Sequence, residues 1–158
     1  SDKLVSTIPG WFTYSQTGTV PWKGWTLSSN NFARITAFGS GQSDVITWMV
    51  APQIDLSTAA EPYISFESCN GYDNGATLKL YVSTDYTGSS SPWTSTWTEL
   101  SFIRPPLTGS GYSPFVSSGK VDLSTYNGST IYLAWVYSGG VPSQTTTWEV
   151  DNVLVAEE

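Results

Sequence analysis

The chain has no histidine and only one cysteine, Cys69. Without histidine it lacks the usual general base of enzymes and the commonest protein ligand for transition metals. A lone cysteine can form neither an intramolecular disulfide nor a thiolate metal cluster. Nucleophile–histidine catalysis and zinc sites built from histidine and cysteine are therefore excluded.

Positive charge is also scarce, because six Lys and Arg face thirteen Asp and Glu, for a formal net charge of −7. Nucleic acids are bound by basic side chains that release counterions from phosphates, so nucleic acid is not an expected partner. No apolar run reaches the ~20 residues of a spanning helix, and we expect no membrane insertion. The low charged fraction of 12% favours a secreted or cell-surface domain.

Long helical periods are missing too, since Pro or Gly interrupts the chain too often. Short β-rich runs recur instead, and several alternate: Leu78, Leu80 and Val82 are expected to face inward, with Lys79 and Tyr81 outward. The 158 residues fit one domain, 1–158, and the pattern predicts an all-β fold, a two-sheet antiparallel jelly-roll sandwich. The predicted strands are 32–38, 45–50, 63–68, 78–83, 96–103, 131–137 and 148–155.

A short phrase occurs twice, as Ile-Asp-Leu-Ser at 54–57 and Val-Asp-Leu-Ser at 121–124. Each copy leads through a polar turn into an aromatic strand. An Asp side chain at such a corner accepts hydrogen bonds from backbone amides just ahead of it. We therefore interpret Asp55 and Asp122 as structural residues.

The last predicted strand carries two carboxylates, Glu149 and Asp151, which face the same way because a strand repeats every second residue. Laminarinase-type glycosidases have a similar Glu-x-Asp strand followed by a further Glu, which completes a retaining pair of acids. Here Val153 and Leu154 stand where that last carboxylate belongs. A glycoside hydrolase of lectin-like fold is therefore the less favoured interpretation, and no catalytic residue is predicted.

Asp151 is also a candidate calcium ligand, because calcium takes six to eight oxygens from carboxylates and carbonyls of distant segments. Its predicted partner is Glu67, on the strand over 63–68. Alternatively, Asp151 accepts backbone N–H groups at a strand end and binds no metal. A structural calcium is the cofactor that the sequence suggests.

Eight Trp, nine Tyr and six Phe make up 15% of the chain, more than so small a core needs. A sugar ring presents C–H bonds on its faces, so an exposed Trp or Tyr offers it apolar contact while polar neighbours bond its hydroxyls. The same aromatics can instead pin their loops to the sandwich. Five aromatics in loop-like segments are the candidate ligand-binding residues: Trp22, Trp25, Tyr72, Trp93 and Tyr112.

Seven segments follow one another in a specific order: Trp-Met-Val-Ala-Pro-Gln-Ile-Asp-Leu-Ser at 48–57, Ile-Ser-Phe-Glu at 64–67, Leu-Tyr-Val-Ser-Thr-Asp-Tyr at 80–86, Trp-Thr-Glu-Leu at 97–100, Ser-Gly-Lys-Val-Asp-Leu-Ser at 118–124, Tyr-Leu-Ala-Trp-Val-Tyr at 132–137, and Thr-Trp-Glu-Val-Asp-Asn-Val at 147–153. Together they resemble the choice-of-anchor J and cleaved-adhesin type domains of surface proteins from Bacteroidetes. Those are jelly-roll sandwiches similar to MAM and galactose-binding-like modules.

The resemblance implies a non-catalytic extracellular module, secreted or attached to the outer membrane as part of a longer protein. It places Asp151 at the position that helps to hold a structural calcium in related jelly rolls. Taken with the aromatic excess, it favours binding of a polysaccharide or other glycan. The alternative is an adhesion or assembly domain that binds other surface proteins. Glycan binding predicts at least two exposed, roughly coplanar aromatics. Protein binding predicts a flat, exposed apolar patch. An enzyme predicts a deep pocket with a second carboxylate near Glu149 or Asp151.

Overall fold

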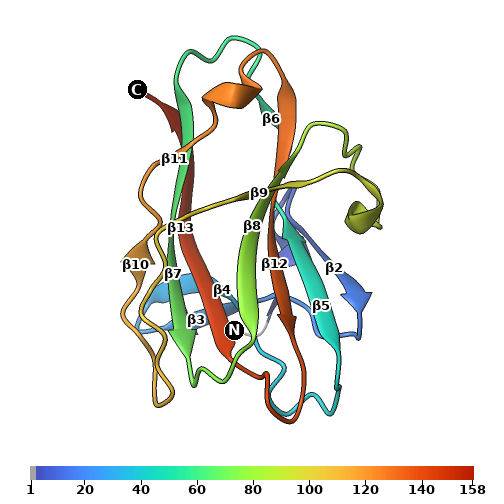
Figure 1. Cartoon of the computed structure of the whole chain (residues 1–158), viewed down its shortest axis with the longest axis vertical. Coiled ribbons are helices and arrows are strands. Elements are labelled where there is room, and N and C mark those ends of the chain that lie inside the picture. The colour runs from blue at the N-terminus through green and yellow to red at the C-terminus, as the bar shows by residue number, and fades with distance from the viewer. Residues whose placement is uncertain (1–2) are drawn as a thin grey trace.

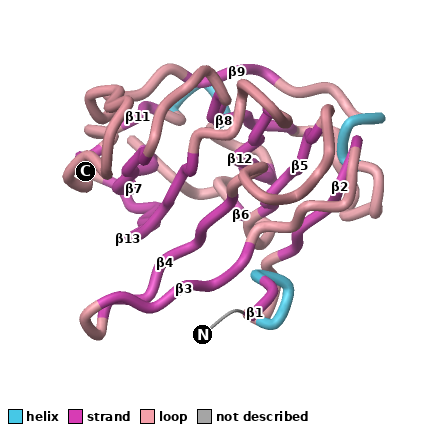
Figure 2. Tube along the Cα trace, turned by 90° about the horizontal axis from the view of Figure 1, so that it is seen from below, coloured by secondary structure: helices cyan, strands magenta, loops and turns pink. Residues whose placement is uncertain are grey.

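The chain folds into two antiparallel β-sheets that pack face to face, in a computed structural model that describes residues 3–158 (Figures 1 and 2). The first sheet has the order β1-β3-β4-β13-β7-β10, with β11 also on β7. The second has the order β2-β5-β12-β8-β9, with β6 also on β12. The predicted all-β fold with two antiparallel sheets is confirmed.

The strand bounds of the first sheet are β1 Lys3–Leu4, β3 Lys23–Leu27, β4 Asn30–Ile35, β7 Pro62–Gly71, β10 Val116–Ser117, β11 Val121–Asp122 and β13 Thr147–Glu157. Those of the second are β2 Phe12–Thr17, β5 Val45–Val50, β6 Ile54–Asp55, β8 Thr77–Ser83, β9 Thr98–Leu100 and β12 Thr130–Gly139. The helical segments of the described chain are single 3-10 turns at Val5–Thr7, Pro92–Thr94 and Ser124–Tyr126. No helix among the described residues is long and apolar enough to cross a membrane.

The hydrophobic core fills the space between the sheets. Leu78, Leu80 and Val82 of β8 are buried, as their alternation predicts. Trp135 of β12 and Trp148 of β13 meet them from the two sheets, and both are at most 2% exposed. This interior is apolar enough to hold the sandwich without a disulfide.

The repeated phrase forms equivalent corners at the two short strands β6 and β11. Asp55 Oδ1 accepts the backbone N–H of Ser57 at 2.9 Å, and Asp122 Oδ1 accepts that of Ser124 at 2.8 Å. Hydrogen bonds to a charged carboxylate lower its pKa. For Asp55 the backbone N–H of Ser57 is the main cause, and for Asp122 it is the Ser124 hydroxyl, followed by the Ser124 backbone N–H. The structural interpretation of the two residues is confirmed.

Each sheet carries one long loop on its outer side. The β8–β9 loop, residues 84–97, packs Tyr86, Trp93 and Trp97 against the second sheet. The β9–β10 loop, residues 101–115, runs beside β7 of the first sheet (Figure 1). Backbone hydrogen bonds fasten it there, from Tyr72 N–H to Gly111 O at 2.9 Å and from Ser113 N–H to Asn70 O at 2.8 Å. The second loop thereby builds up one end of the outer face of the first sheet.

Candidate functional site

A row of polar side chains crosses the outer face of the first sheet. The strand register places Lys23 of β3 opposite Arg34 of β4, Arg34 opposite Glu149 of β13, and Glu149 opposite Cys69 of β7. Directly opposed residues on one face of an antiparallel sheet lie within side-chain reach of one another. The row therefore contains one side chain from each of four strands, each next to the side chain on the neighbouring strand.

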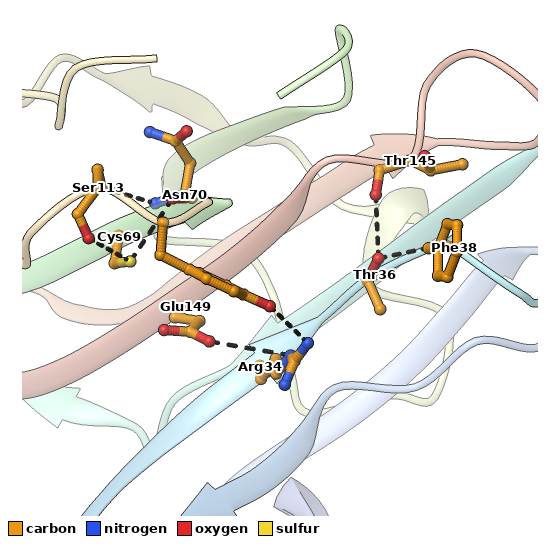
Figure 3. A network of polar contacts seen from close by, with 9 residues as sticks. Arg34, Thr36, Phe38, Cys69, Asn70, Ser113, Thr145 and Glu149 are labelled. Carbon is orange, nitrogen blue, oxygen red and sulfur yellow. Dashed lines mark hydrogen bonds and ion pairs between the residues drawn. The ribbon is translucent and has the colours of Figure 1, made fainter. Parts of the chain in front are cut away.

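Arg34 is the centre of this row (Figure 3). Its Nε lies 3.8 Å from Glu149 Oε1, and its Nη2 donates a hydrogen bond of 2.8 Å to the hydroxyl of Tyr112. Its guanidinium carbon also lies 4.6 Å from the ring centroid of Trp25 and 5.7 Å from that of Tyr112. Such cation–π contacts hold the planar guanidinium against the aromatic rings.

Glu149 lies beneath this arrangement and is only 5% exposed. Burial raises the pKa of its carboxyl, and the nearby Arg34 charge and Cys69 thiol lower it in part. Burial also raises the pKa of the Cys69 thiol to about 11. The Glu149 carboxylate thus serves as an internal counterion that orients Arg34, and the Cys69 thiol stays protonated and unreactive at neutral pH.

Tyr112 and Tyr72 meet at the end of β7, where the β9–β10 loop crosses the sheet. Gly71 makes room for Tyr112, because a Cβ on that glycine would collide with the tyrosine ring. Tyr72 has a φ of 50°, a left-handed conformation that is costly for a bulky residue. The two rings pack edge to face, with centroids 5.5 Å apart and planes at 85°.

Two adjoining hollows flank Arg34 and share the side chains of Arg34, Thr36 and Phe38. We call them together the Arg34 groove. Phe38 lines both hollows and is 78% exposed, and its backbone N–H donates a hydrogen bond to the Thr36 hydroxyl (Figure 3). One hollow, of about 440 Å³, is also lined by Thr19, Val20, Pro21, Lys23, Trp25, Ile35, Gly39, Ser40 and Gln42. The other, of about 560 Å³, is also lined by Tyr72, Asp73, Asn74, Gly109, Tyr112, Thr145 and Thr147.

Three of the five predicted ligand-binding aromatics come together in this groove. Trp25 is 39% exposed, Tyr112 45% and Tyr72 57%. They come from three separate segments, β3, the β9–β10 loop and the end of β7. The sequence pattern identified them only as loop aromatics, and their convergence on Arg34 is what the fold adds.

The other two predicted aromatics lie elsewhere. Trp22 is fully buried, and its indole N–H donates to the Thr47 carbonyl at 3.3 Å. The prediction that it contacts a ligand at the surface is therefore wrong, because its ring belongs to the core. Trp93 packs against the Trp48 cluster on the second sheet, so it pins the β8–β9 loop and does not reach the Arg34 groove.

Sequence reasoning missed Arg34 and Phe38. Arg34 is a single charge in an otherwise apolar strand-like run, Phe32 to Ile35, which could have marked it as an outward side chain with a specific partner. Phe38 was included in the predicted strand over 32–38. The strand ends at Ile35, and Phe38 lies in the following turn, where it is exposed.

The two predicted calcium ligands do lie opposite each other, since Asp151 of β13 pairs with Glu67 of β7. Each already receives an amide hydrogen bond, Asp151 from the side chain of Asn30 at 2.9 Å and Glu67 from that of Asn152. No group of three or more Asp, Glu, Cys or His within residues 3–158 is placed to hold a metal. Asparagine oxygens can ligate calcium, so this cluster fits the ion only in part, and the calcium site stays a prediction.

The carboxylate pair does not have the setting of a glycosidase. Glu149 lines neither half of the Arg34 groove. Asp151 lines a separate hollow of about 280 Å³, in which no second Asp or Glu of the described chain takes part. Retaining and inverting mechanisms both need two carboxyl groups that flank one bond. Catalysis by Glu149 and Asp151 therefore has no geometric support, and the absence of enzymatic activity stays a prediction.

No protein-family model matches the sequence, and no curated protein resembles it closely enough in sequence to count as a relative. Solved structures match the fold. Two cleaved adhesin domains of Lys-gingipain from Porphyromonas gingivalis W83 are similar to this chain. The K1 domain has 18% identity and a TM-score of 0.64, and the match covers 95% of this chain and 92% of that one. The K3 domain has 13% identity and a TM-score of 0.65, and the match covers 100% of this chain and 98% of that one.

Two further structures have the same sandwich. One is TmCBM61, solved in complex with β-1,4-galactotriose, with 13% identity, a TM-score of 0.52 and coverage of 95% of this chain and 90% of that one. The other is the glycoside hydrolase domain of Endo-D from Streptococcus pneumoniae R6, with 13% identity and a TM-score of 0.56; the match covers 94% of this chain but 22% of that one. At these identities the likeness concerns the fold, and the fold is one that cleaved adhesin domains share.

Proposed function

We propose that this chain is a non-catalytic extracellular recognition module that binds a glycan in the Arg34 groove. The observation that carries the proposal is the convergence of Trp25, Tyr112 and Tyr72 around Arg34, with all three rings partly exposed. A single exposed aromatic is ordinary on a protein surface, whereas exposed apolar side chains gathered in one place mark an interaction site. Exposed rings grouped around a hydrogen-bonding cation are what a sugar requires, since its faces are apolar and its rim is polar.

Arg34 supplies the polar part of this recognition. A guanidinium has five N–H donors in a fixed plane, and here the groups on Nε and Nη2 are directed to Glu149 and the Tyr112 hydroxyl. The remaining donors can serve ring hydroxyls. Because Glu149 and two aromatic rings already orient the guanidinium, a ligand does not have to order it on binding.

The aromatic arrangement differs from a flat platform. The rings of Tyr72 and Tyr112 stand at 85° to each other, so the expectation of coplanar aromatics fails for this pair. A perpendicular pair forms a corner, which can contact one sugar on its face and its neighbour on its edge. A corner favours a bent glycan chain or a branch point over a flat, ribbon-like polymer.

The known structures support the proposal at the level of fold. TmCBM61 was solved with β-1,4-galactotriose bound on a similar sandwich, and Lys-gingipain carries similar domains that are named adhesin domains. A secreted or cell-surface location and a relationship to choice-of-anchor J domains are part of the same proposal. A role in binding other surface proteins is the alternative.

A glycan array tests the proposal. The domain is applied in buffer with calcium and in buffer with a chelator, beside Trp25→Ala and a matched variant, Phe12→Ala. Phe12 is a suitable control because it is 46% exposed and lies on β2 of the second sheet. We expect glycan signals that Trp25→Ala loses and Phe12→Ala keeps. Absence of binding to any glycan in either buffer would remove the proposal and favour a protein partner.

A further inference from the structure

Building on the proposed glycan site, we infer that one half of the Arg34 groove holds a neutral sugar residue, whose hydroxyl groups donate hydrogen bonds to Asp73. This half is the hollow of about 560 Å³ that Tyr72 and Tyr112 line, and we call it the Tyr72 hollow. The inference rests on the proposed function and adds the chemical class of the sugar, which the aromatic contacts alone do not determine. Three observations carry it: an unpartnered oxygen of Asp73, a rigid frame around that residue, and two unpartnered hydroxyl groups in the same hollow.

Asp73 has one carboxylate oxygen that accepts hydrogen bonds within the fold and one that does not. Its Oδ1 accepts the backbone N–H of Gly75 at 3.3 Å and the hydroxyl of Thr146 at 3.0 Å. Its Oδ2 accepts no hydrogen bond and forms no ion pair within the described chain. The buried side-chain atoms without a partner in that part of the chain are Ser68 Oγ and Trp135 Nε1, so Asp73 Oδ2 is open to solvent. Because an ionised carboxylate only accepts hydrogen bonds, a ligand at Oδ2 has to be a donor.

The turn that carries Asp73 is held in place by hydrogen bonds of the chain itself. Asn74 makes most of them, because its Oδ1 accepts the backbone N–H of Thr145 at 2.6 Å and its Nδ2 donates to the Thr145 hydroxyl at 2.9 Å. Its backbone N–H donates to the Thr146 hydroxyl at 3.0 Å. Thr36, which follows β4, donates to the Thr145 carbonyl at 3.0 Å (Figure 3). A carboxylate on so constrained a turn loses little freedom when it binds a ligand, and this favours affinity.

Two hydroxyl groups of residues that line the Tyr72 hollow also have no hydrogen-bond partner in the described chain. One belongs to Tyr72, which is 57% exposed, and the other to Thr147, the first residue of β13. Thr147 lies two residues before Glu149 and therefore faces the same outer side of the sheet. Its hydroxyl is not among the buried unpartnered atoms, so it too is open to solvent. Because a hydroxyl group both donates and accepts, these two groups can bond to a sugar hydroxyl in either direction.

The charged residues that line the Tyr72 hollow are one cation and one anion, Arg34 and Asp73. No ion pair links the two within the described chain. Arg34 only donates hydrogen bonds and Asp73 only accepts them, and a hydroxyl group can satisfy either. A carboxylate or sulfate would be repelled by Asp73, and an ammonium group would be repelled by Arg34. The hollow therefore selects an uncharged sugar residue with free hydroxyl groups.

Isothermal titration with matched oligosaccharides tests this inference. The neutral probes are β-1,4-galactotetraose, cellotetraose and β-1,4-mannotetraose, which differ in the orientation of single hydroxyl groups. Each is compared with its oxidised form, in which the primary hydroxyl groups have become carboxylates and the linkages are unchanged. We expect at least one neutral probe to bind about tenfold or more tightly than its oxidised form, because a carboxylate cannot donate to Asp73 and is repelled by it.

Three variants locate the effect, with thermal unfolding as the check that each is folded. Asp73→Asn keeps one oxygen for the turn and removes the charge, so it should bind the neutral probe about tenfold more weakly and lose most of the preference over the oxidised form. Thr147→Val keeps the shape of the side chain and removes its hydroxyl, and should weaken neutral binding about threefold. Asp85→Asn is the matched control, because Asp85 also accepts turn hydrogen bonds, from Ser83 and Thr96, but in the β8–β9 loop. It changes the net charge equally and should leave the preference in place.

The outcomes separate this inference from the proposed function. Oxidised probes that bind as tightly as the neutral ones, in a manner that depends on Trp25, would overturn the neutral sugar and leave the glycan site standing. Equal effects of Asp73→Asn and Asp85→Asn would also overturn it, because the preference would then reflect net charge. Tighter binding of a β-1,4-glucosamine tetrasaccharide than of cellotetraose would overturn it in favour of a cationic sugar. Absence of binding by every tetrasaccharide would overturn it too, and the glycan array decides independently whether the glycan site stands.

Discussion

Replacement of Trp25 by alanine is the most informative single perturbation of the Arg34 groove. A tryptophan side chain has up to ~250 Å² of surface, and Trp25 is 39% exposed, which leaves about 100 Å² for a ligand on that scale. A sugar ring that covers half of this area removes about 50 Å² from water, worth ~1.3 kcal/mol at ~25 cal/mol per Å². The variant should therefore bind its glycan about tenfold more weakly.

Loss of the ring also frees the guanidinium of Arg34, whose carbon lies 4.6 Å from the Trp25 centroid. A cation–π contact at an exposed site is worth about 0.5–1 kcal/mol, so the total effect should lie between about twentyfold and fiftyfold. The assay is isothermal titration, with thermal unfolding as the control for folding and Phe12→Ala as the control for loss of an exposed ring. An unchanged affinity in Trp25→Ala together with a weakened one in Phe12→Ala would move the site to the second sheet and refute this reasoning.

Three further predictions concern the support of the groove. Gly71→Ala should displace the ring of Tyr112, because the new Cβ would collide with it; we expect a glycan affinity reduced several-fold, and unchanged binding in a folded variant would mean that Tyr112 is not a contact. Glu149→Gln tests the buried acid. Burial raises the pKa of the Glu149 carboxyl, so this group stays protonated to higher pH in the folded chain than in the unfolded chain. Proton binding by Glu149 therefore favours the folded state at low pH, and this stabilisation is lost as the pH rises through the folded pKa. Denaturant titrations give the unfolding free energies of the parent chain and of Glu149→Gln. Their difference, parent minus variant, should fall as the pH rises from about 4.5. A difference that rises with pH would mean that folding lowers the pKa of Glu149. Calcium should raise the midpoint of thermal unfolding if Asp151 and Glu67 bind it, since an ion that binds only the folded state stabilises it by ~2.7 kcal/mol at a hundredfold excess over Kd; the same midpoint after complete chelation would leave both residues as acceptors of amide hydrogen bonds.

Strands that obey a simple alternation could be predicted from the sequence. The prediction over 45–50 matches β5, and β8 and β12 extend no more than two residues beyond their predicted runs. The strands β2 and β3 were not predicted, because neither has the alternation of apolar and polar residues that puts apolar side chains on the inner face. In β2 the aromatic Phe12 is exposed and Tyr14 packs against the Trp48 cluster of the second sheet. Thr13 uses its hydroxyl to accept the backbone N–H of Trp22 at 3.0 Å.

The candidate site could be predicted only in part, for a reason that Trp22 and Trp25 illustrate. The two residues are three positions apart, and in an extended chain an odd separation puts side chains on opposite faces. Only Trp25 therefore reaches the outer face, a distinction that required β3 to be recognised as a strand. Arg34 was missed because its role depends on Glu149 and Tyr112, which the sequence separates from it by 115 and 78 positions.

The central claim is that the outer face of the first sheet is the binding face. Nuclear magnetic resonance of the tryptophan indole N–H groups tests it most directly, because each sheet carries its own reporter. Trp25 reports on the Arg34 groove, and Trp48, whose indole N–H donates to Gln16 at 2.9 Å, reports on the outer face of the second sheet. Titration with a glycan selected by the array should shift the Trp25 resonance and leave that of Trp48 in place; a shift confined to Trp48 would contradict the account.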